Sequence, residues 1–316
     1  MDATISIDRI REAADAIDPV FLHTPQFASE PLSERIGVQT ILKVESVNPI
    51  RSFKGRGADY LMHRLGADAG TIVCASAGNF GQGMAYACRK RGIALTVFAA
   101  QNANPLKIER MRRLGARVEL RGDDFDEAKD AARRHAEDDG HLFVEDGLLG
   151  AIAEGAGTIA VELTQAPDSI DAVFVPLGNG ALVNGVGTWL KYRSPRTRVI
   201  AVCAESAPSM ALSWKSRKPM TAPGSTIADG IAVRVPVAEA VATMAKTVDD
   251  VMLVSDEEMR LAMRRLFIDA GLVVEPAGAA GIAAIAIRAK EFADRRVAAI
   301  LTGGNLTEQQ IRDWLY

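Results

Sequence analysis

The stretch that decides the fold of this chain is Ala172-Val173-Phe174-Val175-Pro176-Leu177-Gly178-Asn179-Gly180-Ala181-Leu182. Its first five residues form a short apolar run, which predicts a buried strand at residues 172–176. A glycine-containing turn follows, and a helical pattern begins at Leu182. Glycine lets a ligand approach the backbone closely, and a helix N-terminus attracts anions. The stretch could therefore cradle a phosphate, although a plain tight turn would give the same pattern.

The alternation of strand and helix extends along the whole chain. Short β-rich runs predict strands at residues 40–44, 71–75, 95–99, 172–176, 199–204, 251–254 and 297–301. Helical periodicity predicts helices at residues 104–114, 124–137, 156–163 and 277–290. Capping boxes at 255–258 and 307–310 should begin two more helices, whereas the proline-containing segment 206–228 should form a long surface loop. The pattern is typical of an α/β protein with open, mostly parallel twisted sheets flanked by helices.

The composition indicates a globular chain that does not bind nucleic acid. A length of 316 residues with 48% hydrophobic content suffices for two domains or one large one. The formal net charge is −3, with both signs mixed throughout the chain. Such a chain has no basic field that would attract DNA or RNA.

The cysteines and the apolar runs indicate the compartment. The three cysteines lie in apolar surroundings, which predicts free thiols in a reducing compartment. The acidic N-terminus from Met1 to Thr4 shows no signal peptide, and no apolar run approaches membrane-spanning length. We therefore expect a cytoplasmic protein that does not contact a membrane.

Several polar or glycine-rich positions each follow a predicted strand. Ser76, Gly178, Glu205 and Thr302 stand directly after, or two residues after, four of these runs. In open parallel sheets, ligands bind in the crevice outside the carboxyl ends of the strands. The loops that carry these residues are therefore expected to converge on one site.

Two of these loops could bind anions. Ser76-Ala77-Gly78-Asn79-Phe80 offers several backbone amides to a carboxylate and one amide side chain for orientation, although it could equally be a capping turn. The loop at residues 178–182 lacks the glycine that a dinucleotide fingerprint needs, because position 183 is Val. It also lacks the lysine of a Walker A loop, because position 186 is Val. Nucleotide binding is therefore disfavoured.

Lys54 could supply the amine for this site. Phe53 offers apolar cover, and Arg51 and Arg56 could disfavour the protonated amine, although either arginine could instead pair with a surface carboxylate. By itself Lys54 could equally be a solvated surface residue. Combined with the anion-binding loops, it indicates a site for a phosphorylated aldehyde cofactor held as a Schiff base.

Metal chemistry has weaker support in the sequence. His23, His63, His135 and His141 show no metal-ligand spacing, and we interpret them as structural or solvated. Glu205, at a strand end, could bind a divalent cation, but a lone carboxylate is more often a cap or an ion-pair partner. Residues 206–215 contain no acidic partner for it. A divalent cation therefore remains uncertain.

With these residues in view, the chain resembles the fold type II pyridoxal-phosphate enzymes, and within them the serine/threonine dehydratase and serine racemase group. Ser52-Phe53-Lys54 is similar to the motif that carries the cofactor lysine, and residues 76–83 are similar to the family's Ser-x-Gly-Asn-x-x-Gln loop. Residues 226–233 and 274–280 resemble two further active-site segments. The resemblance covers nearly the whole chain.

The resemblance assigns roles to particular residues. It implies that the cofactor is pyridoxal 5'-phosphate, and that the cofactor-binding residues are Phe53, Lys54, Asn79, Gly178, Asn179, Gly180, Ala181, Leu182, Glu275 and Thr302. Asn79 would meet the pyridine 3-hydroxyl, and Thr302 would face the ring nitrogen. The substrate would contact Ser76, Ala77, Gly78, Asn79, Phe80 and Gly230, with Arg51 as a further candidate.

The resemblance also implies the domains and the partners. Residues 1–69 and 142–316 would form a large cofactor-binding domain, and residues 70–141 a small mobile domain that closes over the substrate. The partner would be a small-molecule amino acid, and the protein would be a homodimer. With the chain ending at Tyr316, no regulatory domain and no feedback inhibition are expected.

The implied reaction is β-elimination from a β-hydroxy amino acid, which yields a 2-oxo acid and ammonia. Lys54 would remove the α-proton as a general base. Racemisation is disfavoured, because Ala77 stands where the racemase has a second acid/base serine. Besides threonine or serine, Arg51 could recognise 3-hydroxyaspartate and Phe80 could favour phenylserine. The alternatives are β-replacement, a threonine-synthase-like reaction, racemisation, or a catalytically silent pyridoxal-phosphate protein.

Overall fold

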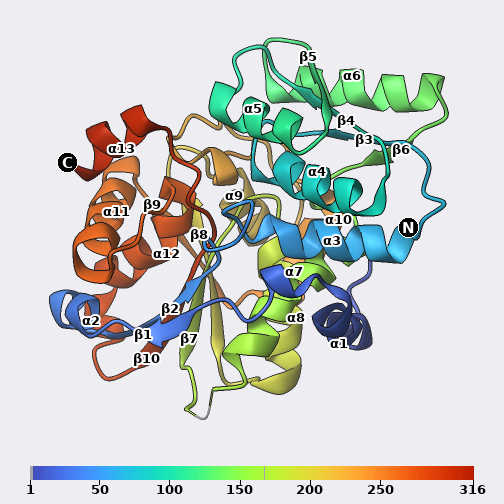
Figure 1. Cartoon of the computed structure of the whole chain (residues 1–316). Coiled ribbons are helices and arrows are strands. Elements are labelled where there is room, and N and C mark those ends of the chain that lie inside the picture. The colour runs from blue at the N-terminus through green and yellow to red at the C-terminus, as the bar shows by residue number, and fades with distance from the viewer. Residues whose placement is uncertain (1–2, 167) are drawn as a thin grey trace.

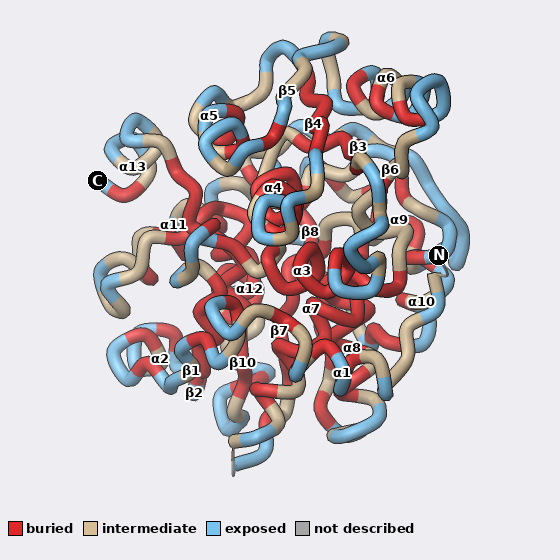
Figure 2. Tube along the Cα trace, turned by 45° about the vertical axis from the view of Figure 1, so that its right-hand side comes forward, coloured by how far each residue is buried: buried red, intermediate tan, exposed pale blue. Residues whose placement is uncertain are grey.

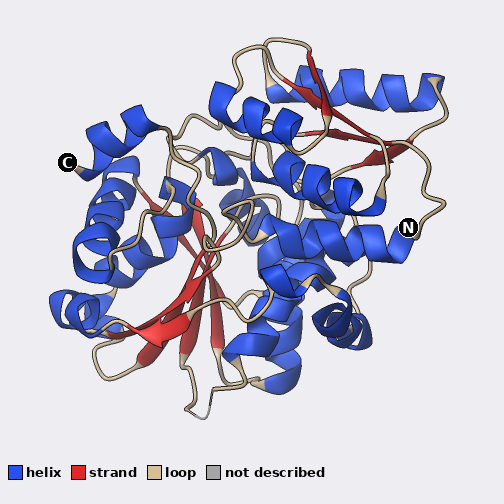
Figure 3. Cartoon of the chain, viewed as in Figure 1, coloured by secondary structure: helices blue, strands red, loops and turns tan. Residues whose placement is uncertain are grey.

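The computed structural model describes residues 3–166 and 168–316 and contains two mostly parallel sheets (Figures 1 and 3). Met1 and Asp2, which begin the acidic N-terminus, lie outside the described residues. The six-stranded sheet has the order β1 (Gln26–Ala28), β2 (Gln39–Val44), β10 (Arg296–Leu301), β7 (Ala172–Pro176), β8 (Arg198–Ala204) and β9 (Asp250–Val254). The four-stranded sheet has the order β5 (Arg117–Leu120), β4 (Leu95–Ala99), β3 (Ile72–Ala75) and β6 (Leu142–Val144).

Helices follow most strands, as a βα pattern requires. The α-helices are α1 (Ile7–Ala16), α2 (Glu30–Ile36), α3 (Lys54–Leu65), α4 (Asn79–Arg91), α5 (Pro105–Arg113), α6 (Phe125–Asp138), α7 (Gly150–Leu163), α8 (Ala181–Arg193), α9 (Ser209–Ser216), α10 (Ala238–Thr247), α11 (Asp256–Ala270), α12 (Pro276–Ile287) and α13 (Glu308–Leu315). Short 3-10 helices are η1 (Pro19–Phe21), η2 (Asp229–Ile231) and η3 (Ala289–Glu291). Only β1 pairs antiparallel to its neighbour, at the edge of the large sheet.

The large sheet is covered on both faces, which explains why its strands are apolar throughout. On one face, α12 packs against β7, β8, β9 and β10, and every residue from Pro276 to Ile285 is buried. A helix that is apolar all round in this way is a core helix. On the other face lie α7 and α8, which cross so closely that a Cβ at Gly185 would lie 1.9 Å from the carbonyl oxygen of Ala153. Figure 2 shows α3, α7 and α12 as mostly buried.

The small sheet lies between helices as well. α4 packs against α3 of the large unit, and a shared apolar cluster that includes Met84 and Cys88 joins the two units. The opposite face of the small sheet is covered by α6, whose Ala132 and Ala136 pack on Val73 and Phe98. The two sheets therefore meet through α3 and α4, next to the carboxyl ends of their strands.

The sequence predicted the long buried strands and both capping boxes correctly. The Ser255 and Thr307 hydroxyls cap α11 and α13. In return, the side chains of Glu258 and Gln310 accept hydrogen bonds from the backbone amides of Ser255 and Thr307. Strands β1, β5 and β6 were not predicted, because β1 and β6 have only three residues and β5 is a charged strand without a buried residue. The helix predicted at 156–163 begins earlier, at Gly150, because packing overrides the low helix propensity of its glycines.

The prediction of a surface loop at residues 206–228 was wrong in part. Helix α9 lies within this segment, with Ser209, Met210 and Ser213 buried. Its N-cap is Pro208, and Pro219 follows its end, so the prolines flank the helix and do not interrupt it. Composition alone overestimated their breaking effect.

The expected domain division falls inside the small sheet. β6 begins at Leu142 and pairs in parallel with β3, so a boundary between residues 141 and 142 would cut this sheet. We propose that the small unit extends to Val144. Among the residues that the structure describes, no helix combines the length and the apolar character needed to cross a bilayer.

The three cysteines are expected to resist alkylation in the folded protein. Cys74, Cys88 and Cys203 are free and buried, and burial raises the pKa of the Cys88 and Cys203 thiols to about 12. Since the thiolate is the nucleophile, iodoacetamide at pH 8 should modify none of them in the native protein and all three after unfolding. Mass spectrometry of intact protein checks this, and rapid labelling of any one cysteine in the native state would contradict it.

Candidate functional site

A cavity of about 560 Å³ lies where the carboxyl ends of the two sheets face each other. Its walls come from both units, with Ala75–Phe80 and Phe143–Asp146 from the small unit and Pro176 and Gly178–Gly180 from the large one. The predicted site residues that line it are Phe53, Lys54, Ser76, Ala77, Gly78, Asn79, Phe80, Gly178, Asn179, Gly180, Leu182, Gly230, Glu275 and Thr302. The convergence expected from the strand ends is therefore present in the structure.

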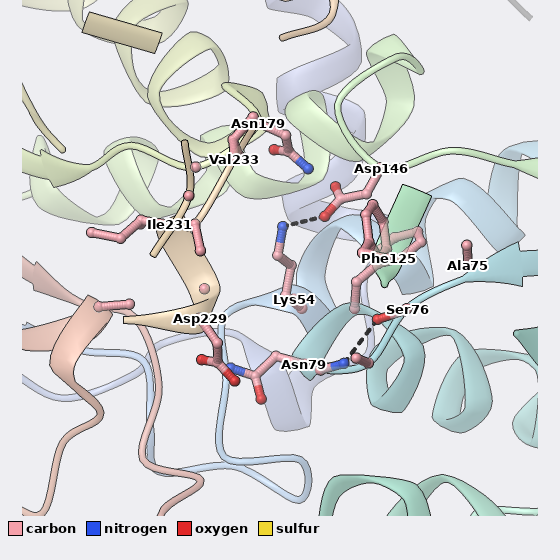
Figure 4. A pocket seen from close by; sticks show the side chains of 18 of the residues that line it. Lys54, Ala75, Ser76, Asn79, Phe125, Asp146, Asn179, Asp229, Ile231 and Val233 are labelled. Carbon is pink, nitrogen blue, oxygen red and sulfur yellow. Dashed lines mark hydrogen bonds and ion pairs between the residues drawn. The ribbon is translucent and has the colours of Figure 1, made fainter. Parts of the chain in front are cut away.

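Lys54 is the first residue of α3, and its amine points into this cavity (Figure 4). The preceding residues are fixed to the loop after β10, because the Phe53 amide and the Ser52 hydroxyl both donate to the carbonyl of Thr302, at 3.1 and 3.2 Å. The Lys54 Nζ lies 4.8 Å from the centre of the Phe53 ring and 2.5 Å from Asp146 Oδ2. The side chain is only 14% exposed. Lys54 is therefore a cavity residue and not a solvated lysine.

The glycine turn after β7 approaches the backbone of another segment. A Cβ at Gly178 would lie 2.7 Å from the Gly230 carbonyl oxygen, and Gly180 adopts a left-handed φ of +99°. α8 begins at Ala181, whose amide is bonded to Asn179 Oδ1 at 3.2 Å, and its N-cap Gly180 has no side chain to cap the other amides of the first turn. This helix start can bind a phosphate. Ala181 is buried and does not line the cavity.

Replacing Gly178 by alanine is expected to weaken cofactor binding. The new methyl group would displace the Gly230 segment from the turn, because a carbon atom cannot lie 2.7 Å from a carbonyl oxygen. We expect the dissociation constant for pyridoxal phosphate to rise at least about tenfold, or about 1.4 kcal/mol. Titration of the apoprotein followed by cofactor absorbance measures this, with circular dichroism as the control for folding. An unchanged dissociation constant would mean that the turn does not bind the cofactor.

The loop after β3 offers a second anion site. The Ser76 hydroxyl accepts bonds from the amides of Gly78 and Gly81, at 3.1 and 2.9 Å, so it folds the loop back onto the start of α4. Asn79 is the first residue of this helix, and Phe80 follows as a buried wall of the cavity. This geometry suits the carboxylate of an amino acid.

Asn79 is held by a buried network. Its Nδ2 donates to Glu275 Oε2 at 3.0 Å, and its Oδ1 accepts from Asn305 Nδ2 at 2.8 Å. Glu275 also accepts from the Asn305 amide at 2.7 Å, and burial raises the pKa of this carboxyl group despite the nearby cation of Lys107. Glu275 therefore fixes the orientation of Asn79. Thr302 lines the same end of the cavity and is buried.

Arg51 and Glu205 lie outside the cavity lining. Arg51 is exposed, with a left-handed φ of +52°, and its carbonyl accepts the Gly304 amide at 3.0 Å. Glu205 is exposed at the end of β8. Arg56, which was considered as a neighbouring cation or a surface ion-pair partner, is instead fully buried and bonded to Glu45 and Glu162.

Sequence reasoning missed several residues of the cavity. Asp146, in the turn after β6, contacts the Lys54 amine directly. Lys107 of α5 is 3% exposed and lies 2.5 Å from Asp229. Phe125, the first residue of α6, also lines the cavity. Asp146 stands two residues after the three-residue run Leu142–Val144, which is too short to read as a strand, and for Lys107 and Phe125 no comparable signal exists in the sequence.

The histidines were interpreted as structural or solvated, but three potential metal ligands converge. Atoms of His135, Asp139 and His141 lie within 4.8 Å of one another, at the end of α6 opposite Phe125. His135 Nδ1 is 3.0 Å from Asp139 Oδ2. These residues do not line the cavity, so they do not belong to the site described above.

The donor set of the cavity fits the cofactor that the resemblance implies. A lysine amine is available for an aldehyde, an uncapped helix start for a phosphate, Asn79 for a phenolic hydroxyl, and Thr302 for a ring nitrogen. Apolar walls from Phe53 and Phe80 leave space for an aromatic ring. The site therefore suits pyridoxal phosphate.

Comparisons with known proteins agree with this geometry. The family described as "Pyridoxal-phosphate dependent enzyme" matches residues 17–303. An L-threonine ammonia-lyase from Thermotoga maritima is 36% identical over 310 residues, which cover 97% of this chain and 77% of that protein. The processed form of threonine deaminase isoform 2 from Solanum lycopersicum has a TM-score of 0.89 and 30% identity, covering 99% of this chain and 89% of that one.

A second solved structure extends the likeness. Maize serine racemase has a TM-score of 0.90 and 27% identity, covering 98% of this chain and 96% of that one. The likeness to both structures spans both sheets and the cavity between them. The chain therefore belongs to the fold type II pyridoxal-phosphate dependent enzymes.

Proposed function

We propose that this chain is a pyridoxal-phosphate-dependent ammonia-lyase that converts a β-hydroxy amino acid into a 2-oxo acid and ammonia. The observation that carries the proposal is the Lys54 amine in an enclosed cavity, between an uncapped helix start suited to phosphate and an amide loop suited to a carboxylate. The relative from Thermotoga maritima, named L-threonine ammonia-lyase, supports the same reaction.

The residues of the cavity have separable roles in this proposal. Bound pyridoxal phosphate supplies an electron sink for the electron pair left at Cα when the α-proton is removed. Lys54 Nζ accepts that proton as general base. The amides of Ala77, Asn79 and Phe80 hold the substrate carboxylate, and Asn79 orients the cofactor ring. The neutral hydroxyl of Thr302 cannot keep the ring nitrogen protonated as a carboxylate would, which makes a milder electron sink suited to elimination.

The substrate class is threonine-like or serine-like. Phenylserine and 3-hydroxyaspartate are more specific candidates. They differ in whether the side chain is aromatic or acidic, so the aromatic and charged residues of the cavity wall bear on the choice between them. A homodimer and a cytoplasmic location stay predictions from the sequence. Closure of the small unit over the substrate would exclude water during the reaction.

The test is a panel of β-hydroxy amino acids assayed for both ammonia and 2-oxo acid. Equal amounts of the two products from serine, threonine or phenylserine are expected. Release of neither product from any member would overturn the proposal. A product formed only when a thiol or another nucleophile is added would indicate β-replacement, and a change in optical rotation without ammonia would indicate racemisation.

A further inference from the structure

The charged side chains that line the cavity are mostly paired with one another. Arg234 bridges from the large unit to Asp124 and Asp126 at the start of α6, at 2.8 and 3.2 Å. Lys107 pairs with Asp229 at 2.5 Å. The Lys107 pair is neutral and the Arg234 group keeps one negative charge, so neither leaves a free cation for an acidic ligand.

Glu145 is compensated in the same way. Its carboxylate lies 3.4 Å from Lys129 and 3.1 Å from Arg133, both on α6. Asp146, the next residue, differs, because the cation beside it is Lys54. In the proposed function Lys54 is bonded to the cofactor before substrate arrives and must be a neutral amine to accept the α-proton, so in neither state is it the ammonium that compensates Asp146.

Asp146 is also incompletely satisfied as it stands. Its Oδ2 contacts Lys54 Nζ, while its Oδ1 is buried and has no hydrogen-bond partner among the described residues. The side chain is 16% exposed. A buried carboxylate oxygen without a donor is costly, and such an atom on a cavity wall calls for a donor from the ligand.

The backbone holds Asp146 in place. Gly147 has a φ of +91°, and a Cβ there would lie 2.9 Å from the Cβ of Asn179, so the turn after β6 packs directly on the phosphate turn. Figure 4 shows the Asp146 carboxylate between Lys54 and Phe125, with Asn179 nearby. The backbone that carries Asp146 is therefore fixed against the phosphate turn.

From this arrangement we propose that Asp146 determines substrate specificity, so that the site accepts β-hydroxy amino acids with a neutral side chain and rejects those with a second carboxylate. A substrate hydroxyl can donate to the buried oxygen, whereas a second carboxylate cannot donate and is repelled by it. The proposal rests on the proposed function and narrows the range of β-hydroxy amino acids that the enzyme accepts. It favours serine, threonine and phenylserine over 3-hydroxyaspartate.

The walls around Asp146 agree with a neutral side chain. Phe80, Phe125 and Phe143 all line the cavity and offer apolar surface. Arg51, which could have recognised a second carboxylate, is exposed and lies outside the lining. No unpaired cation among the described lining residues remains to bind such a group once Lys54 holds the cofactor.

Two measurements on the holoenzyme test this. The first is kcat/KM for threonine and for 3-hydroxyaspartate, in both configurations, with the wild type and Asp146→Asn. The second is the dissociation constant of alanine and of aspartate, read from the absorbance of the bound cofactor, because neither ligand has a hydroxyl to eliminate. Asparagine keeps the shape of aspartate and removes its charge. Glu257→Gln is the control for loss of one negative charge, since Glu257 is exposed, pairs with Arg260 on α11 and does not line the cavity.

We expect the wild type to favour threonine and alanine over their acidic counterparts by at least about tenfold. Asp146→Asn should shrink both preferences about tenfold, and Glu257→Gln should leave them unchanged. A wild type that binds aspartate as tightly as alanine would overturn the proposal, as would an equal shift in both variants. If Asp146→Asn does not bind cofactor, the same comparison is made with Asp146→Ser. The preferences of the wild type then still show whether acidic ligands are rejected.

Failure of the proposed function looks different. In that case no panel member releases ammonia, yet the ratio of aspartate to alanine binding still reports the charge filter. A wild-type enzyme that deaminates 3-hydroxyaspartate better than threonine would refute the filter while supporting the ammonia-lyase activity.

Discussion

Replacing Lys54 by alanine is expected to lower the rate of ammonia release by at least about 10³-fold. The variant loses both the amine that holds the cofactor and the base that removes the α-proton. Its site is otherwise intact, because the neighbouring residues are fixed by Thr302 through backbone bonds. The measurement is release of ammonia and 2-oxo acid at saturating substrate and cofactor. The absorbance of bound cofactor should also change, since no lysine nitrogen is attached to it.

The matched control for this variant is Lys90→Ala. Lys90 lies on the surface, 2.8 Å from Asp18, so its loss should leave the rate within about twofold of the wild type. Substantial activity of Lys54→Ala would show that another group performs the chemistry. Another buried amine on the cavity wall is that of Lys107, which is paired with Asp229.

The sequence could predict the loops of the site because each one follows a long buried strand. β3 and β7 are fully buried and β10 is buried from Val297 to Leu301, so their apolar runs were readable and their carboxyl ends could be placed together. The residues after them, Ser76, Gly178 and Thr302, line the cavity as expected. Topology alone brings these three positions together.

The rest depends on features without a local signal. β6 has three residues, two of them half-buried, so neither the strand nor the position of Asp146 could be deduced. Arg51 stands next to the lysine motif in sequence, but a left-handed backbone conformation at that residue leaves its side chain exposed. Proximity in sequence therefore did not indicate which side chains reach the substrate.

Arg56 is a second residue whose position in the sequence did not indicate where its side chain lies. It lies two residues after Lys54, but on a helix such neighbours do not share a face, and its guanidinium points into the core. It donates to Glu45 at 2.8 and 2.9 Å and to Glu162 at 2.6 and 3.0 Å. Lys43 contacts Glu162 as well, so two cations and two carboxylates form one buried cluster. This cluster joins β2, α3 and α7 next to the turn of helix that carries Lys54.

Replacing Arg56 by methionine is expected to lower the free energy of unfolding by about 3–5 kcal/mol, because two carboxylates would stay buried with only Lys43 to compensate them. Urea unfolding of the apoprotein measures this. In Arg312→Met, which removes an exposed helical ion pair with Glu308, the loss should stay below about 1 kcal/mol.

The effect of Arg56 on stability should depend on pH. Burial raises the pKa of Glu162, but the hydrogen bonds and charges of Arg56 and Lys43 outweigh burial and lower this pKa overall. The stabilisation is therefore complete above an unfolded-state pKa of about 4.3 and is lost as pH falls below it, so the difference between wild type and variant should shrink in acid. A difference that stays constant from pH 7 to pH 3 would show that Arg56 contributes by packing and not by charge.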